Sequence, residues 1–270
     1  FLGKPYIDIR LSFCSFIPKN ISEKLAGKLL DFYLNYLNQN REYHDKIEFK
    51  VIPTCATSNF NYWHEILSLN DEFTESEIKI LRQELTKITK DCFLKPKIYL
   101  EKIEELKQKN RTVKNSNLNH FEKARILLED CKRLGTLPFA HLARCAFIAI
   151  NLLNDATYSG HISKEAKDSF LNSIRTISHE FGEDGKAALS GKLAWEKYVN
   201  KYGHLRPGTY DINSERYDSN VDFYLKNTIC DQKNNFNQYK EIWEKEKEKF
   251  FNCLKELKLS SDAKLIEDFL

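Results

Sequence analysis

Methionine is absent from the 270 residues of this chain, and glycine and proline are scarce, with nine and six copies. Because the chain also begins with Phe1, we expect it to be a segment of a longer protein. The glycine-rich loops that cradle phosphate groups, G-x-x-x-x-G-K-[ST] and G-x-G-x-x-G, do not occur in the sequence. The H-E-x-x-H and G-x-S-x-G signatures are also missing. The common catalytic motifs therefore indicate no enzyme.

Neither sign of charge predominates, because 42 Lys and Arg residues oppose 39 Asp and Glu residues and leave a formal net charge of +3. A nucleic-acid surface needs a patch of one sign, so we expect no nucleic-acid partner. Seven cysteines, none in a C-x-x-C pair, argue against a disulfide framework and a zinc site. We therefore expect no metal and a cytoplasmic location. The longest apolar run, "CAFIAINLL", is about half of the ~20 residues that a membrane span needs, so we expect no membrane partner.

Hydrophobic periodicity predicts a mainly α fold with one small β element near the N-terminus. Residues 5–13, "PYIDIRLSF", alternate polar and apolar side chains, and 46–55, "KIEFKVIPTC", show the same pattern, so both are predicted strands. A helix between them is predicted to begin at a capping box of Asn20 and Glu23. We predict a small α/β subregion over 1–70 and a helical region over 71–270, packed together as one domain.

After residue 70 the spacing of apolar residues is helical. "TESE" forms a capping box ahead of the first of these helices, and Gly135 is predicted to end a later one. "NRTVKNSN" is the predicted linker. The predicted helices are 75–92, 97–109, 117–134, 136–153, 163–181, 187–200 and 237–257. The helix over 136–153 is apolar on nearly every face, so we expect it to be the most buried, with its core contacts made by Phe139, Leu142, Phe147 and Ile150.

The stretch "KYGHLRPGTYDINSERYDSN" interrupts this helical pattern and gathers chemically capable side chains. Arg206 offers a planar fork suited to phosphate or carboxylate, and His204 can move a proton near neutrality. Gly203 and Gly208 permit turns and close approach of a ligand. Thr209, Tyr210 and Asp211 add hydroxyl and carboxylate groups. The alternative is a loop that ends a helix, with Arg206 and Asp211 paired structurally.

Two other groups are weaker candidates for ligand binding. His141 and Arg144 share one face at the start of the apolar helix, where a buried Arg–carboxylate pair and a satisfied histidine are the favoured explanation. Asp8 and Arg10 share one face of the first predicted strand, and ordinary exposed polarity is the favoured explanation for them. Arg144 and Arg10 are kept as candidate substrate-binding residues.

Several collinear segments resemble one enzyme family. "KYGHLRPGTYDINSERYD" resembles the "YGHRGPGE-x-D-(I/L)-x-x-PRY" region of phosphoenolpyruvate synthase-like and rifampicin phosphotransferase-like enzymes. "GKPYIDIRLSFCSFIPKNISEKLAGKLLDFYL", "HDKIEFKVIPTC" and "LLEDCKRLGTLPFAHLARCAFIAINLL" are similar to the central region of the same family. The resemblance extends over residues 2–225. It departs from the family where Leu205-Arg206-Pro207 replaces the commoner Arg-Gly-Pro, and where Thr209 replaces Glu.

The resemblance implies a kinase or phosphotransferase that uses ATP and Mg²⁺. An ATP-grasp domain uses ATP, a phosphohistidine on a mobile domain takes the β-phosphoryl group, and an acceptor receives it, with release of AMP and phosphate. This chain has neither an ATP-grasp pattern nor the "G-G-x-x-S/T-H-x-A-I" segment of the phosphohistidine, so His204 is not that histidine. The resemblance implies the central domain, which binds a small acceptor such as L-glutamine or pyruvate and has no cofactor of its own. It would not be catalytic alone, and its partners would be the other two domains.

Within that implication, the loop would present its groups to the arriving phosphoryl group. Arg206 would neutralise phosphoryl oxygens, His204 would bond acceptor or phosphate, and Asp211 would hold Arg206. Gly208, Thr209 and Tyr210 complete the predicted substrate-binding loop. Two alternatives remain: a linker that only positions the moving domains, and a helical interaction protein.

Overall fold

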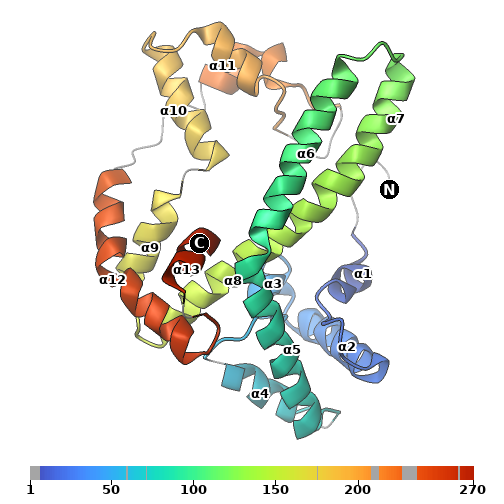
Figure 1. The fold of residues 1–270 in the computed structure, drawn as a ribbon, viewed down its shortest axis with the longest axis vertical. Coiled ribbons are helices and arrows are strands. Elements are labelled where there is room, and N and C mark those ends of the chain that lie inside the picture. The colour runs from blue at the N-terminus through green and yellow to red at the C-terminus, as the bar shows by residue number, and fades with distance from the viewer. Residues whose placement is uncertain are drawn as a thin grey trace. The chain divides into compact units, whose positions relative to one another are not determined.

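The computed structural model describes residues 7–58, 60–70, 72–174, 176–207, 213–226, 236–260 and 262–270. The secondary structure of these residues is helical and comprises thirteen α-helices and no strand. Figure 1 shows how the helices are drawn along the chain. The prediction of a mainly α fold is confirmed, and the prediction of a small β element is wrong.

The chain divides into two compact units, each with its own core. Unit 1 comprises Phe1–Asp8 and Asp168–Lys245, and unit 2 comprises Ile9–Lys167 and Glu246–Leu270. One division precedes α1 (Ile9–Cys14), and the other two fall inside helices, α9 (Lys164–Ser173) and α12 (Phe236–Glu256). The other elements of unit 2 are α1 (Ile9–Cys14), α2 (Glu23–Gln39), the 3₁₀ turn η1 (Arg41–Tyr43), α3 (Ile47–Lys50), α4 (Phe60–Ser68), α5 (Glu75–Leu94), α6 (Pro96–Lys114), α7 (His120–Asp130), the π-helical η2 (Cys131–Thr136), α8 (Leu137–Tyr158) and α13 (Ala263–Phe269). Those of unit 1 are α10 (Ile177–Leu189), α11 (Trp195–Tyr202), the 3₁₀ turn η3 (Tyr217–Ser219) and the π-helical η4 (Asp222–Lys226).

Both predicted strands form other structures where they are described. In the first, Ile7 and Leu11 are 76% and 70% exposed, so their alternation does not mark the buried face of a sheet. In the second, α3 is followed by a turn in which the amides of Val51 and Ile52 both donate to the carbonyl of Ile47. The backbone therefore bonds locally, and its apolar side chains are buried against helices. Alternating polarity was insufficient because a strand also needs a neighbouring strand to bond with.

The N-terminal half of unit 2 has a continuous apolar core from α1, α2, α4 and α5. Its largest fully buried side chains include Tyr33, Phe13 and Phe60. Helix α2 begins at Ser22, whose side chain accepts a hydrogen bond from the amide of Leu25, so the predicted start at Asn20 is wrong. The predicted capping box of α5 is confirmed, with Thr74 and Glu77 bonding each other's backbone amides.

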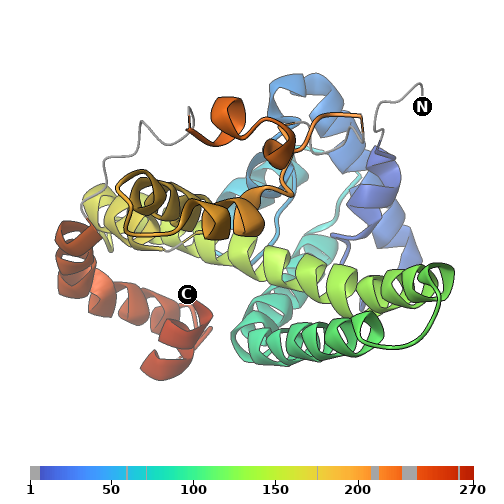
Figure 2. The same ribbon diagram turned by 90° about the horizontal axis from the view of Figure 1, so that it is seen from above.

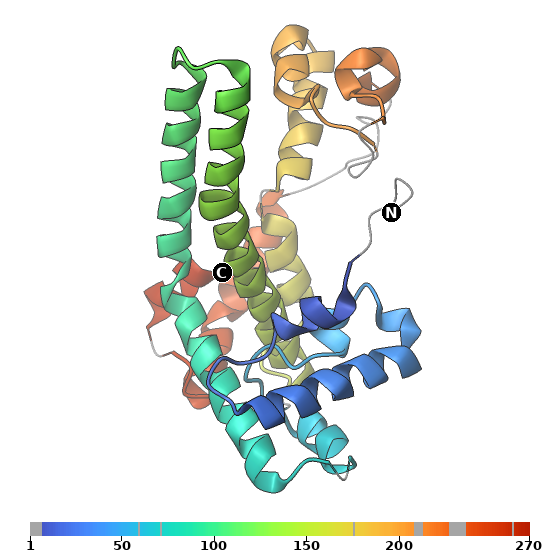
Figure 3. The same cartoon turned by 90° about the vertical axis from the view of Figure 1, so that its right-hand side faces the viewer.

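The predicted end of a helix at Gly135 is wrong. Helices α7, η2 and α8 run on as one rod, which Figure 2 shows, and α6 lies beside α7 as an antiparallel hairpin in Figures 1 and 3. A β-carbon on Gly135 would lie 3.2 Å from the Leu106 side chain of α6, so the glycine permits close helix packing instead. Gly160 and Gly191, at φ 76° and 75°, follow the ends of α8 and α10. The predicted linker is also shorter, because α6 continues to Lys114.

Helix α8 is apolar but is not buried on every face. Ile148 is fully buried, whereas Phe139 is 70% exposed and Leu142, Phe147 and Ile150 are only half-buried. The prediction that this helix would be the most buried element, with those residues in the core, is therefore wrong. Within the described residues, the stretch His120–Tyr158 is long and apolar enough to cross a membrane by length and composition, and 28% of its apolar window is buried in this structure.

Substitutions on α8 should separate its two faces. We expect Ile148→Ala to lower the free energy of unfolding by ~2–5 kcal/mol, because a buried side chain leaves a cavity. Phe139→Ala should change the free energy of unfolding by less than ~0.5 kcal/mol, because the Phe139 side chain is mostly exposed and buries little surface on folding. Urea unfolding followed by circular dichroism measures both values. A large loss from Phe139→Ala would mean that another surface covers this residue.

An ion pair between Lys28 of α2 and Glu77 joins the α5 capping box to α2. The Lys28 ammonium lies 2.8 Å and 2.9 Å from the two Glu77 oxygens and 2.6 Å from the carbonyl of Glu72. The hydrogen bond from Lys28, helped by the amide of Thr74, lowers the pKa of Glu77 from 4.5 to about 2. A carboxylate whose pKa is depressed by folding stabilises the fold above its unfolded pKa, and loses that contribution as the pH falls.

We therefore expect Glu77→Gln to lower the melting temperature at neutral pH, because glutamine keeps the capping box but loses the charge. The difference from the unsubstituted chain should shrink as the pH falls from 4.5 toward 2. Melting curves across this range test it, with Glu101→Gln on the exposed side of α6 as the matched control. A difference that does not change with pH would contradict the assignment.

Candidate functional site

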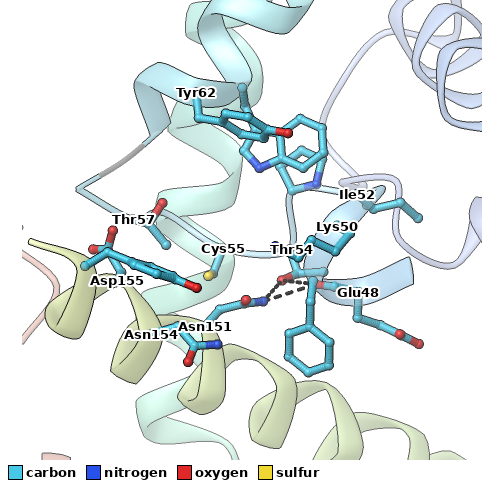
Figure 4. Close-up of a pocket in the computed structure, with 14 residues that line it drawn as sticks. Glu48, Lys50, Ile52, Thr54, Cys55, Thr57, Tyr62, Asn151, Asn154 and Asp155 are labelled. Atoms are coloured by element: carbon cyan, nitrogen blue, oxygen red, sulfur yellow. Dashed lines mark hydrogen bonds between the residues drawn. The ribbon is translucent and has the colours of Figure 1, made fainter. Parts of the chain in front are cut away.

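Unit 2 contains a cavity of about 480 Å³ between α8 and the segment that joins α3 to α4 (Figure 4). A volume of this size is within the range of small-molecule sites, roughly 300–1,000 Å³. The lining combines aromatic, amide, hydroxyl and charged side chains: Glu48, Phe49, Lys50, Ile52, Pro53, Thr54, Cys55, Thr57, Tyr62, Trp63, Asn151, Asn154, Asp155 and Tyr158.

Helix α8 supplies one wall through a polar face near its C-terminal end. Asn151, Asn154, Asp155 and Tyr158 follow each other at helical steps of three, one and three, which places them on one face. The opposite wall is the irregular segment 51–58 with the preceding helix α3, and Tyr62 and Trp63 of α4 add an aromatic edge (Figure 4).

The amide of Asn151 fixes the distance between the two walls. Its Nδ2 donates to the carbonyl of Glu48 at 3.1 Å and to Thr54 Oγ1 at 2.8 Å, the contacts drawn in Figure 4. Both partners lie about a hundred residues away along the chain and belong to the irregular wall. The Asn151 side chain of α8 thus donates hydrogen bonds to a carbonyl and a hydroxyl that have no partner from helical hydrogen bonding.

Asp155 holds the next part of the same wall. Its carboxylate is 5% exposed and accepts hydrogen bonds from the Ser58 amide at 2.7 Å and the Ser58 hydroxyl at 2.8 Å. The amide of Ala56 donates to Thr89 Oγ1 of α5 at 2.9 Å. Hydrogen bonds to an ionised acceptor are stronger than neutral ones. The segment is therefore held on two sides by side chains from helices.

Two cysteines near Asp155 are held in the thiol form. Burial raises the pKa of Cys55 to about 12, the charge of Asp155 adds to this, and a hydrogen bond with Thr54 opposes it. Burial also raises the pKa of Cys253 to about 11, again with a contribution from Asp155. Because a thiol is a poor nucleophile compared with its thiolate, Cys55 serves as an apolar part of the lining.

The charges of the lining favour particular ligands. Glu48 and Asp155 contribute two carboxylates and Lys50 one ammonium, so the lining carries one net negative charge. Glu48 is half-buried and Lys50 is exposed at the rim. A simple anion is disfavoured in such a cavity, whereas a neutral or zwitterionic molecule can bond to amides and charges of both signs.

The predicted loop lies in unit 1 and is described only in part. Gly208, Thr209, Tyr210 and Asp211 lie outside the described residues. The His204 side chain is exposed. Arg206 is half-buried, and its Nη1 donates to the carbonyl of Ser214 at 2.8 Å. Part of the guanidinium therefore holds its own loop together, and the predicted pairing with Asp211 stays a prediction.

Gly203 has a packing role in this loop. A β-carbon there would lie 2.6 Å from the carbonyl of Val199 and 2.8 Å from the Asp218 side chain. The later part of the loop packs against Gly203 here, and the amide of Asp218 donates to the carbonyl of Gly203 at 3.0 Å. This close approach accounts for the glycine without a ligand.

The other predicted binding residues lie in unit 2 and have local partners. Arg144 donates to the carbonyl of Ser15 and stacks its guanidinium 5.2 Å from the centre of the Phe16 ring. Arg10 pairs with Asp31 at 3.0 Å on the surface. Neither arginine lines the cavity. Arg144 is thus bound to a carbonyl and an aromatic ring, and not in the buried carboxylate pair that the sequence suggested as an alternative.

The polar face of α8 was not singled out in the sequence. Its only signal is "NLLND", in which three polar residues at helical spacing end an otherwise apolar helix. Among the residues that the structure describes, no group of three His, Cys, Asp or Glu side chains could hold a metal ion.

Comparison of the chain with family models, with curated proteins and with solved structures finds no match. The resemblance to phosphoenolpyruvate synthase-like enzymes therefore remains a prediction from the quoted segments.

The hydrogen bonds of Asp155 give a test of the cavity wall. We expect Asp155→Asn to reduce the free energy of unfolding by ~1.5–3 kcal/mol, because asparagine replaces charge-assisted hydrogen bonds with neutral or mismatched ones. Asp45→Asn, the same change at an exposed position, should have almost no effect. Urea denaturation compares the two variants. Equal stabilities would mean that the carboxylate does not hold the wall.

Proposed function

We propose that this chain is the central, acceptor-binding domain of a phosphoenolpyruvate synthase-like phosphotransferase, and that the cavity of unit 2 binds the acceptor. On this proposal the ATP-grasp and phosphohistidine parts lie outside these 270 residues. The β-phosphoryl group of ATP passes through the phosphohistidine to the acceptor, with release of AMP and phosphate.

One observation carries the proposal. The two walls of the cavity come from two segments that resemble the family, "HDKIEFKVIPTC" and the segment that ends in "AFIAINLL". They are far apart in the sequence, yet Asn151 joins them through Glu48 and Thr54. A linker would need no cavity between them with amide, hydroxyl and charged groups in its lining.

The charge of the lining separates the two acceptors that the resemblance suggests. Pyruvate is a simple anion and would meet a net negative lining. L-Glutamine is a zwitterion with a carboxamide, so Lys50 can face its carboxylate while Glu48 and the aromatic rings face its ammonium group. We therefore favour an acceptor of the L-glutamine kind.

The loop around Arg206 has a more limited part in the proposal. Phosphoryl transfer depends mainly on positioning and charge stabilisation, which an arginine and a histidine can supply. Thr209 replaces the glutamate of many relatives, so a carboxylate must come from elsewhere. Glu48 is one candidate, because no hydrogen bond or ion pair joins its side chain to the described residues.

The alternative, a linker domain that only positions the moving domains, is favoured by one contact. Arg206 bonds to Ser214 within its own loop, as a purely structural arginine would. Ligand binding by the cavity distinguishes the two functions.

Thermal melting of this chain with L-glutamine or pyruvate tests the proposal. L-Glutamine should raise the melting temperature, because a ligand at about 100 times its Kd stabilises the folded state by ~2.7 kcal/mol. Pyruvate should have no effect. Thr57→Val removes a hydroxyl from the lining with little change of shape and should weaken binding by roughly tenfold, the loss of about one hydrogen bond. Thr112→Val on the exposed side of α6 is the matched control. No shift with either compound would favour the linker.

Incubation of the chain with β- and γ-labelled ATP gives a second test. We expect neither ATP hydrolysis nor label on a histidine, because the sequence has no phosphate-cradling loop and no phosphohistidine segment. Acid-labile label that stays on the chain would contradict the assignment to a central domain.

A further inference from the structure

A second cavity lies in unit 2 between α4 and the N-terminal part of α5, two helices that pack together. Its volume is about 390 Å³, which is within the range of small-molecule sites, roughly 300–1,000 Å³. Phe60 and His64 of α4 form one wall, and α5 supplies the other. No residue lines both this cavity and the cavity beside α8, so the two are separate.

The α5 wall is one continuous face of that helix. Glu75, Ile78, Lys79 and Arg82 follow each other at steps of three, one and three, the spacing of neighbours on a helical surface. Their positions are therefore set by regular helical geometry, which holds side chains more precisely than a loop does.

The base of this cavity is apolar and its rim is cationic. Phe60 and Ile78 are 1% and 2% exposed, whereas Lys79 and Arg82 are exposed at the rim. The Arg82 guanidinium lies over the Phe60 ring, 5.5 Å from the centre of the ring. The ring covers one face of the guanidinium, and the N–H donors, which lie in the guanidinium plane, stay available to an acceptor.

The two cations of the rim have no carboxylate partner among the described residues. Glu75 precedes Lys79 by four residues, the spacing of a common helical ion pair. Both Glu75 oxygens instead lie close to His64 Nε2, at 2.7 Å and 2.9 Å. Within the described chain, the side chains of Lys79 and Arg82 form no ion pair or hydrogen bond. The rim therefore carries positive charge that the protein itself does not neutralise.

We propose that this cavity binds a small organic carboxylate carried on an apolar ring. The carboxylate lies between the Lys79 ammonium and the Arg82 guanidinium, whose planar fork matches two carboxylate oxygens. The ring covers Phe60 and Ile78 and packs along the aliphatic stems of the two cations. A neutral molecule would leave both cations without a partner, and an acid of two or three carbons would leave the apolar base uncovered. The proposal does not depend on the proposed function, because the acceptor cavity shares no residue with this one.

Fluorine NMR of the whole chain with 4-fluorobenzoate as the probe tests the site. A titration followed by the shift and the width of the fluorine signal gives the Kd. We expect saturable binding, and roughly tenfold weaker binding of 4-fluorobenzyl alcohol, which keeps the ring but lacks the charge. Acetate, which lacks the ring, should displace the probe only at concentrations roughly tenfold above those needed with benzoate. Added salt should weaken binding of the probe, because the rim is exposed to solvent.

Substitutions in α5 locate the bound probe. Arg82→Gln should raise the Kd of 4-fluorobenzoate by roughly tenfold and Lys79→Gln by roughly threefold, because the guanidinium offers two hydrogen bonds to the carboxylate and the ammonium one. Arg82→Lys keeps the charge but loses the fork, so its Kd should lie between those of the unsubstituted chain and Arg82→Gln. Lys90→Gln, at an exposed position of α5 outside the cavity, is the matched control and should leave the Kd unchanged. Melting curves followed by circular dichroism check that each variant is folded.

Three outcomes would overturn the proposal. Equal Kd values in the unsubstituted chain, Arg82→Gln and Lys79→Gln would place the probe elsewhere. Binding of 4-fluorobenzyl alcohol as tight as that of 4-fluorobenzoate would remove the role of the two cations. A fluorine signal that does not saturate with the probe would mean that the cavity is not a binding site.

Discussion

The cavity depends on the hydrogen bonds that Asp155 and Asn151 make across to the segment 51–58. This segment is buried and irregular, so its amides and carbonyls cannot find partners in a helix or a sheet, and each unsatisfied group would cost free energy. Ser58 and Ala56 find them in the side chains of Asp155 and Thr89. The walls are consequently joined by polar side chains at a few points, and the space between those points stays open. A segment packed only by apolar side chains would have closed onto α8.

The same interaction sets the electrostatics of the cavity. The Asp155 carboxylate accepts two hydrogen bonds from Ser58, and its charge adds to the effect of burial in raising the pKa of Cys55 and Cys253. Removing a carboxylate from water costs free energy, and the hydrogen bonds that it accepts must offset that cost. A charge at this position in the cavity wall can also orient a ligand, which gives the Asp155 carboxylate a second role. This reasoning links the stability of the wall to the charge preference that we propose for the acceptor.

The sequence predicted the helical class and several helix ends because those signals are local. The capping box at Thr74 and the long helix of the C-terminal tail depend on residues within one or two turns, and both are present. The strands were mispredicted because alternation in residues 5–13 says nothing about a neighbouring strand. Phe139 was placed in the core because an apolar helix does not reveal which of its faces has a partner. The cavity could not be predicted, since Asn151 meets Thr54 only through the tertiary fold.

The segment 51–58 and the loop after α11 are held in different ways, and this bears on which of them is better suited to bind a ligand. The loop after α11 is held mainly by its own backbone: the amide of Tyr217 donates to Leu205, that of Asp218 to Gly203, and Arg206 to Ser214. These residues of the loop therefore hydrogen-bond to partners eight to fifteen positions away in the same loop. The segment 51–58 is held by side chains from distant helices, and among the described residues the side chains of its Thr57 and of Glu48 in α3 make no hydrogen bond of this kind. A group that already stabilises its own loop must break a hydrogen bond to bind a ligand. A group with unused hydrogen-bonding capacity gains a hydrogen bond when the ligand binds. The balance of contacts therefore favours the cavity beside α8 as the place of the acceptor site that we propose, in preference to the loop after α11 that the sequence suggested.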